Sequence, residues 1–175
     1  AGGTVATPAG VTLTLSPTTL ARGWGSFGGP GTLANQGTIR HETNTSSLTV
    51  QNVQNTGTIE VLNGATIILQ GTWGGGGLVR ATSGTITLGG SFTQTAGQFE
   101  QGAGGEFVVN GTLDLGGGVL TLNATTGGWI LNGGTLRNGT VELVGGVKLV
   151  ATGNGLLQDL TVMGTVTGQA FNSLR

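Results

Sequence analysis

The sequence predicts an all-β fold, a right-handed parallel β-helix in the form of a three-sided β-solenoid with about eight coils of 20–21 residues. Three observations predict it. Glycines followed two positions later by an apolar residue recur at nearly constant spacing, the segments between them alternate apolar and polar residues, and 38 of the 175 residues are glycine. A unit of this size cannot bury an apolar face alone, so successive units are expected to stack around one core.

The recurring glycine marks the first strand of each coil. It steps by 20, 20, 20, 21 and 21 residues through Gly37, Gly57, Gly77, Gly97, Gly118 and Gly139. The apolar residues two positions later are expected to form one inward column of Ile39, Ile59, Val79, Phe99, Leu120, Val141 and Val162. Because crossovers between parallel strands are almost always right-handed, the coil is expected to be right-handed. Glycine at the corners is expected to allow positive φ angles.

Two further strands are predicted in each coil. The second strand has paired apolar residues, as in Leu48 and Val50, Ile67 and Leu69, Ile86 and Leu88, Phe107 and Val109, and Trp129 and Leu131. The third strand begins after a glycine with a Thr or Ser and then an apolar residue. The pairs are Thr32-Leu33, Thr72-Trp73, Ser91-Phe92, Thr112-Leu113 and Thr135-Leu136. Two-residue alternation rich in Thr, Val and Ile, interrupted by Gly and Asn, is typical of strands and turns. No segment has helical periodicity.

The whole chain, 1–175, is predicted to be a single solenoid domain. Regular coils cover 37–162; residues 1–36 form an irregular first coil or cap with a loop at 16–30, and 163–175 form the C-terminal end. Trp24 and Phe27 in the loop either cover the open end of the core or contact a ligand. No cap is evident at Gln169–Arg175, which indicates a chain cut from a longer solenoid or one that associates end to end with further coils.

Composition excludes several functions. Only 7% of residues are charged and the net charge is −1, so no basic surface for nucleic acid is expected. The chain has no Cys and a single His, His41, expected at a strand end; we therefore expect no metal site and no cofactor. Asp114 and Asp159 lie more than three coils beyond His41, too far for a catalytic triad. No apolar run approaches the roughly 20 residues that span a bilayer.

One set of charged residues repeats with the coil. Three positions after the marker glycine come Arg40, Glu60, Arg80, Glu100, Thr121 and Glu142. On a parallel solenoid these outward side chains lie about 4.8 Å apart, which predicts an exposed ladder of ion pairs. The alternative is a sugar-binding or catalytic stripe, since Glu60 and Glu100 would be roughly 9.6 Å apart, at the edge of the spacing in inverting glycosidases. Arg80 lies between them and favours the ion-pair interpretation.

The phrase Gly31-Thr-Leu-Ala-Asn-Gln-Gly-Thr-Ile39, echoed in 52–61 and 134–143, resembles the repeats of filamentous-haemagglutinin-type adhesins and related autotransporter passengers. The resemblance extends over about 31–162. It implies a secreted or cell-surface bacterial fibre that acts in adhesion or display, with host or matrix glycans or a protein receptor as partners. We therefore expect a non-catalytic shaft or spacer. The alternative is a polysaccharide-binding or polysaccharide-cleaving β-helix that uses the Arg40–Glu142 face. Trp24, Phe27, Arg40, Glu60, Arg80 and Glu100 are the candidate binding residues.

Overall fold

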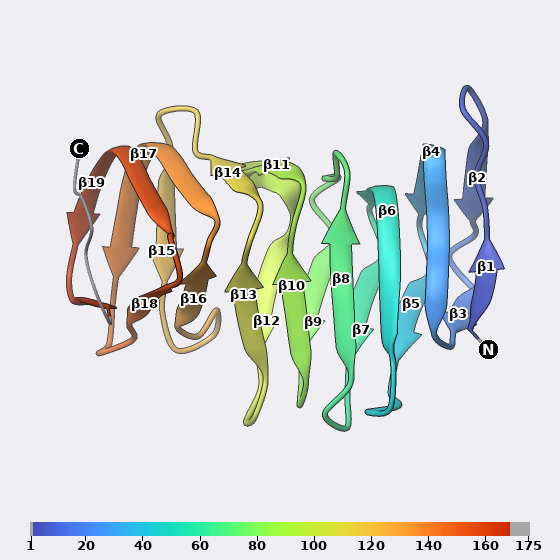
Figure 1. Ribbon diagram of the computed structural model, residues 1–175, viewed down its shortest axis with the longest axis horizontal. Coiled ribbons are helices and arrows are strands. Elements are labelled where there is room, and N and C mark those ends of the chain that lie inside the picture. The colour runs from blue at the N-terminus through green and yellow to red at the C-terminus, as the bar shows by residue number, and fades with distance from the viewer. Residues whose placement is uncertain (1, 169–175) are drawn as a thin grey trace.

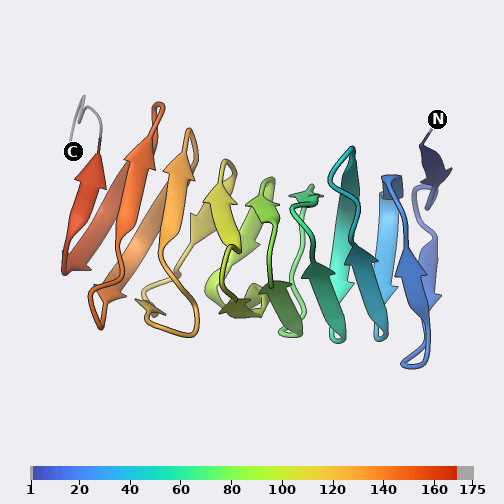
Figure 2. The same cartoon turned by 90° about the horizontal axis from the view of Figure 1, so that it is seen from below.

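The computed structural model describes residues 2–168 and forms a parallel β-solenoid of about eight turns (Figure 1). Its strands lie across the long axis, with the first and the last described strands at opposite ends of the stack. Figure 2, turned by 90°, shows the successive coils side by side along that axis. The all-β prediction is confirmed: in residues 2–168 the only helical segment is a single 3₁₀ turn, η1 (Gln94–Ala96). The right-handed sense of the coil stays a prediction.

The strands form three parallel sheets. A long sheet holds β1 (Gly3–Val5), β2 (Thr12–Leu15), β4 (Gly25–Asn35), β6 (Ser47–Asn55), β8 (Thr66–Gln70), β10 (Thr85–Leu88), β13 (Glu106–Val109), β16 (Trp129–Asn132), β18 (Leu149–Thr152) and β20 (Val166–Gly168). A second sheet, here the ladder sheet, holds β3 (Leu20–Arg22), β5 (Thr38–His41), β7 (Thr58–Val61), β9 (Leu78–Ala81) and β12 (Gln98–Gln101). The third, the C-terminal sheet, holds β11 (Ser91–Thr93), β14 (Thr112–Asp114), β15 (Val119–Leu122), β17 (Thr135–Leu143) and β19 (Leu156–Met163).

The inward columns predicted from the repeat form the core. In the ladder sheet Ile39, Ile59, Val79 and Phe99 are in register, and in the C-terminal sheet Leu120, Val141 and Val162 are. The first six of these seven residues are buried. The paired apolar residues of the second strands are buried as well, and burying one such side chain contributes about 1.5–3 kcal/mol. Stacked apolar columns therefore hold the coils together.

The marker glycines have a different role from the one expected. The φ angles of Gly37, Gly57, Gly77 and Gly139 lie outside the left-handed region. A Cβ atom at Gly57 would instead collide with the carbonyl oxygen of Gly37, one coil earlier. Glycine is therefore required at this corner because successive backbones approach closely, and positive φ angles are found at other glycines, such as Gly64 and Gly90.

The N-terminal segment is more regular than expected. Residues 16–30 include all of β3 and the first part of β4, and Phe27 is buried in register with Val50. Glycine hides the strand alternation here, because Gly25 and Gly28 adopt positive φ and have no space for a side chain beside the neighbouring backbone. A register shift between Gly28 and Leu33 completes the irregularity. The expectation that 169–175 form no cap falls outside the described residues.

One side of the solenoid is interrupted between two coils. β12 and β15 occupy the same position in successive coils but belong to different sheets. Behind them the rings of Phe99 and Trp129 lie 4.9 Å apart, and Phe107 is 5.5 Å from Phe99. These three rings lie together in the core next to the break. The backbone N–H of Gln101 donates to the backbone carbonyl of Thr125 in the following loop, at 2.8 Å.

Candidate functional site

The structure places four of the five charged residues predicted for the ladder in one column. Arg40, Glu60, Arg80 and Glu100 are in register on β5, β7, β9 and β12. Arg40 Nη2 lies 3.0 Å from Glu60 Oε2, and Arg80 Nη2 lies 2.8 Å from Glu100 Oε2. Arg80 Nη1 is also 3.7 Å from Glu60 Oε1. Each guanidinium therefore faces at least one carboxylate of a neighbouring coil.

Glu60 is at the centre of this ladder, and both oxygens of its carboxylate contact side chains of neighbouring coils. Only 10% of its side chain is exposed. Oε2 accepts from Arg40 Nε at 3.1 Å, and Oε1 accepts from the Thr82 hydroxyl at 3.2 Å. A carboxylate with both oxygens already bound has little capacity to bind a ligand or to act on a substrate.

The predicted column does not continue as one ladder beyond Glu100. Thr121 and Glu142 are in register in the C-terminal sheet, with the Thr121 hydroxyl donating to Glu142 at 3.3 Å. At the other end Arg22 is in register with Arg40, a like charge, and its guanidinium instead lies 3.6 Å from Glu42. The Arg22–Glu42 pair was missed from the sequence because Glu42 lies outside the repeating column.

Trp24 and Phe27 border one hollow but differ in exposure. The side chain of Phe27 is in the core, whereas Trp24 is 42% exposed at the N-terminal end. The Trp24 ring lies so close to Gly2 that a Cβ atom there would be 2.7 Å from it. Both residues border a hollow of about 350 Å³ with Val5, Leu20 and Arg22. This arrangement fits the cap interpretation for Trp24.

Buried polar side chains occupy the corners of the early coils. The Asn35 amide donates to Asn55 Oδ1 at 2.7 Å and to the carbonyl of Thr58 at 3.1 Å. Asn55 in turn donates to the carbonyl of Leu78 at 3.1 Å. His41 ends β5, as expected, and is fully buried with Nε2 3.0 Å from the carbonyl oxygen of Ser46. These contacts satisfy backbone carbonyls inside the protein, which is a structural role.

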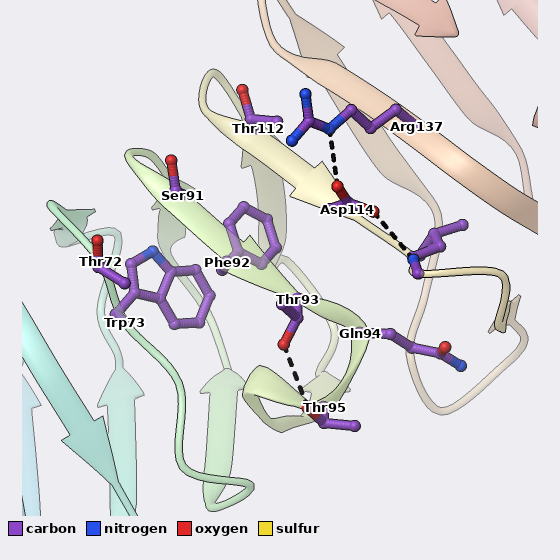
Figure 3. Close-up of a pocket in the computed structure, with 12 residues that line it drawn as sticks. Thr72, Trp73, Ser91, Phe92, Thr93, Gln94, Thr95, Thr112, Asp114 and Arg137 are labelled. Atoms are coloured by element: carbon purple, nitrogen blue, oxygen red, sulfur yellow. Dashed lines mark hydrogen bonds and ion pairs between the residues drawn. The ribbon is translucent and has the colours of Figure 1, made fainter. Parts of the chain in front are cut away.

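A groove that the sequence did not predict lies on the third side of the solenoid. It is an open hollow of about 540 Å³ that crosses β11 and β14 (Figure 3). Its lining residues come from four successive coils: Thr72, Trp73, Ser91, Phe92, Thr93, Gln94, Thr95, Thr112, Asp114, Leu115, Gly116 and Arg137. The only signal for it in the sequence was the hydroxyl-apolar pair of each third strand.

The floor of the groove is aromatic. The rings of Trp73 and Phe92 stack with centroids 4.4 Å apart and planes 18° apart. Trp73 Nε1 donates to the carbonyl of Gly89 at 2.8 Å, which fixes the indole. Beside the rings, Thr72, Ser91 and Thr112 are in register across successive strands. They therefore form a row of hydroxyls at about 4.8 Å intervals.

Asp114 and Arg137 form the charged end of the groove. Arg137 Nε donates to Asp114 Oδ2 at 2.9 Å, and the amide of Asn138 donates to both carboxylate oxygens at 3.0 and 3.1 Å. The backbone N–H of Gly116 donates to Oδ1 at 3.0 Å. The pKa of Asp114 is lowered from 3.8, first by the hydrogen bond from Gly116 and then by that from Asn138; desolvation opposes them, and the charge and hydrogen bond of Arg137 add smaller lowering effects. Asp114 is therefore a carboxylate at neutral pH.

Within residues 2–168, no three His, Asp or Glu side chains lie close enough together to hold a metal ion. The described part of the chain also contains no helix long and apolar enough to cross a membrane. Comparison with protein-family models, with curated proteins and with solved structures finds no match for this chain.

Proposed function

We propose that this chain is a non-catalytic segment of a secreted or cell-surface fibrous protein, in which the β-solenoid acts as a shaft or spacer with an adhesive role. The observation that carries the proposal is the charged ladder. Its carboxylates and guanidiniums pair with each other from coil to coil, so this side of the solenoid joins coils and leaves few charges for a substrate. The resemblance to filamentous-haemagglutinin-type repeats supports the same function.

A spacer must hold a fixed length, and the core supports this property. Inward columns of apolar residues continue from the first coils to the last, and parallel strands pair along the long sheet from β1 to β20. Such a stack resists bending because any bend separates many strand pairs at once.

The spacer function is tested by a distance measurement between two spin labels. The chain has no natural Cys, so Thr14→Cys and Asn154→Cys, both at exposed positions near opposite ends, accept labels selectively. A rigid shaft gives one narrow distribution by pulsed electron spin resonance. A second pair, Thr14→Cys with Gln70→Cys, controls for label mobility over a shorter span. A broad distribution for the long pair beside a narrow one for the short pair would contradict the proposal.

The surface location is tested on the cells that make the protein. Antibody against the purified chain should label intact cells, or the chain should be found in the medium. Labelling only after the cells are permeabilised would contradict a secreted or surface function.

The second candidate is a carbohydrate-binding or carbohydrate-cleaving β-helix. The alignment of Glu60 and Glu100 on one column favours testing cleavage, and the groove favours testing binding. Polysaccharides incubated with the protein should gain no new reducing ends under our proposal. Release of ends that is abolished by Glu60→Gln and Glu100→Gln would establish the catalytic alternative.

A further inference from the structure

We propose that the groove across β11 and β14 binds a neutral oligosaccharide chain and is the adhesive site of the segment. This proposal rests on the adhesive part of the function proposed above. It places the binding site on the third side of the solenoid and not on the ladder, where the sequence predicts four candidate binding residues. Four features of the groove support it: its charge, its mixed polar and apolar lining, its closed strand edges and its length.

The charge of the groove favours an uncharged ligand. Asp114 and Arg137 are the only charged residues among those that line it, and they are paired at 2.9 Å. Their charges cancel, so no field favours an anionic or a cationic chain. The pair still offers oriented hydrogen-bond groups at its exposed surfaces, since 29% of the Asp114 side chain and 44% of the Arg137 side chain are accessible.

The lining mixes hydroxyls with apolar surface. Figure 3 shows the hydroxyls of Thr72, Ser91 and Thr112 in a row beside the rings of Trp73 and Phe92. A sugar ring has hydroxyls at its edge and C–H groups on its faces, which matches such a lining. The two aromatic rings are only 3% and 4% exposed and form the floor, without an open stacking surface. The hydroxyl row and the Asp114–Arg137 pair therefore provide the specificity.

A peptide added as an extra strand does not suit this groove. Strand addition requires an unpaired edge, and β14 is hydrogen-bonded to β11 on one side and β17 on the other. β11 is the end strand of its sheet, and its outer edge is bridged at Ser91, whose backbone bonds to Gly71 and Trp73 of the preceding coil. A ligand here must be recognised through side chains. Lining residues from four successive coils, Thr72, Ser91, Thr112 and Arg137, span roughly 14 Å at the usual strand spacing. This length suits a short chain of sugars better than a single one.

The test measures retention of the intact chain on immobilised neutral oligosaccharides: gluco-, manno-, xylo- and galacto-oligosaccharides of three to six units, beside galacturonan and heparin fragments as charged probes. We expect at least one neutral probe to bind and the charged probes to bind more weakly. For that probe, Ser91→Gln with Thr112→Gln should reduce affinity about tenfold or more by filling the groove.

The matched control is Thr49→Gln with Thr87→Gln. Here two threonines are replaced by Gln at strand positions of β6 and β10 on the long sheet, away from the groove, as a serine and a threonine are in the groove variant. The control should keep the affinity of the unmodified chain, and melting temperatures of both doubles show that the fold is retained. A second groove variant, Arg137→Gln, should also weaken binding.

Three results would overturn the proposal. The first is that no neutral probe is retained, and the second is that the groove and control variants lose affinity for the probe equally. The third is that Glu100→Gln on the ladder lowers the affinity and the groove variants do not. The distance measurement on the shaft is independent of all three. A rigid shaft without glycan binding would therefore reject the groove site alone.

Discussion

The ladder and the groove are built from the same repeat, but their polar side chains differ in whether they pair with side chains of neighbouring coils. Along the ladder sheet the coils step by 20 residues and each charge meets its opposite one coil away. At the groove the step between residues in register varies: it is 19 residues from Thr72 to Ser91, 21 from Ser91 to Thr112 and 23 from Thr112 to Thr135. The 3₁₀ turn η1 lies at one corner there, and a row of hydroxyls faces outward. A regular repeat thus uses its polar groups in joining coils. Where the repeat becomes irregular, Asp114 and Arg137 still pair across coils, but the hydroxyls of Thr72, Ser91 and Thr112 form an outward row, and the proposed ligand site depends on that row.

The largest expected effect on the free energy of unfolding comes from replacing a marker glycine by alanine. Gly57 and Gly97 occupy equivalent corners, the first on the ladder and the second next to the groove. Gly57→Ala places a Cβ atom against the carbonyl of Gly37, a rigid backbone group, and should cost about 3 kcal/mol by overpacking. At Gly97, which follows η1, the nearest atoms are Val79 Cγ2 at 3.0 Å and the Gly77 carbonyl at 3.1 Å. Gly97→Ala should therefore cost about 1 kcal/mol or less, because the valine can shift.

Urea unfolding of both glycine variants measures this difference. Gly3→Ala is the control, because an added Cβ there has no neighbour within 4 Å and should be neutral or slightly stabilising. If Gly57→Ala is as mild as Gly97→Ala, the close approach of coils along the ladder is not the reason for glycine there.

A smaller effect should separate two carboxylates within the ladder. Glu60 is bound by both neighbouring arginines and Thr82, so Glu60→Gln should cost about 1.5–3 kcal/mol, as for buried hydrogen bonds to charged groups. Glu100 has one arginine partner and a side chain that is 42% exposed, and Glu100→Gln should cost less than about 1 kcal/mol. Added salt should reduce the Glu100 effect more than the Glu60 effect. Thermal unfolding measures both losses of stability. If Glu60→Gln and Glu100→Gln destabilise the protein equally, the burial of Glu60 does not strengthen its ion pairs.

The sequence predicted the ladder and failed to predict the groove for one physical reason. Arg40, Glu60, Arg80 and Glu100 recur at a fixed offset from the marker glycine, so spacing alone places them in one column. The groove depends on stacked rings and on the 3₁₀ turn η1, which contributes Gln94 and Thr95 to its lining, and neither follows from a period. Asp114 and Arg137 also differ from the residues at equivalent positions in other coils, which hides their pairing until the register is known.

The core also contains features that the sequence repeat could not predict. The alternation predicted the column from Ile39 to Val141, but Phe27 was placed in a loop because glycines surround it. The repeat could not predict the break between β12 and β15 either. Phe99, Phe107 and Trp129 come from three different strands, and their contact arises only when the coils stack.

The smallest expected effect concerns the carboxylate at the groove and depends on pH. The pKa of Asp114 is lowered in the folded protein, so the ionised form is favoured by folding; its stabilising contribution is complete above pH 3.8 and is lost as the pH falls through the lower folded value. Asp114→Asn should therefore lower the melting temperature slightly at pH 7, and the difference from the unmodified chain should shrink below pH 3.8. Gln98→Asn, at the exposed start of β12, removes no ionisable group and is the control. A difference that persists unchanged in acid would mean that Asp114 contributes through its shape and hydrogen bonds alone, and that its charge does not order the groove.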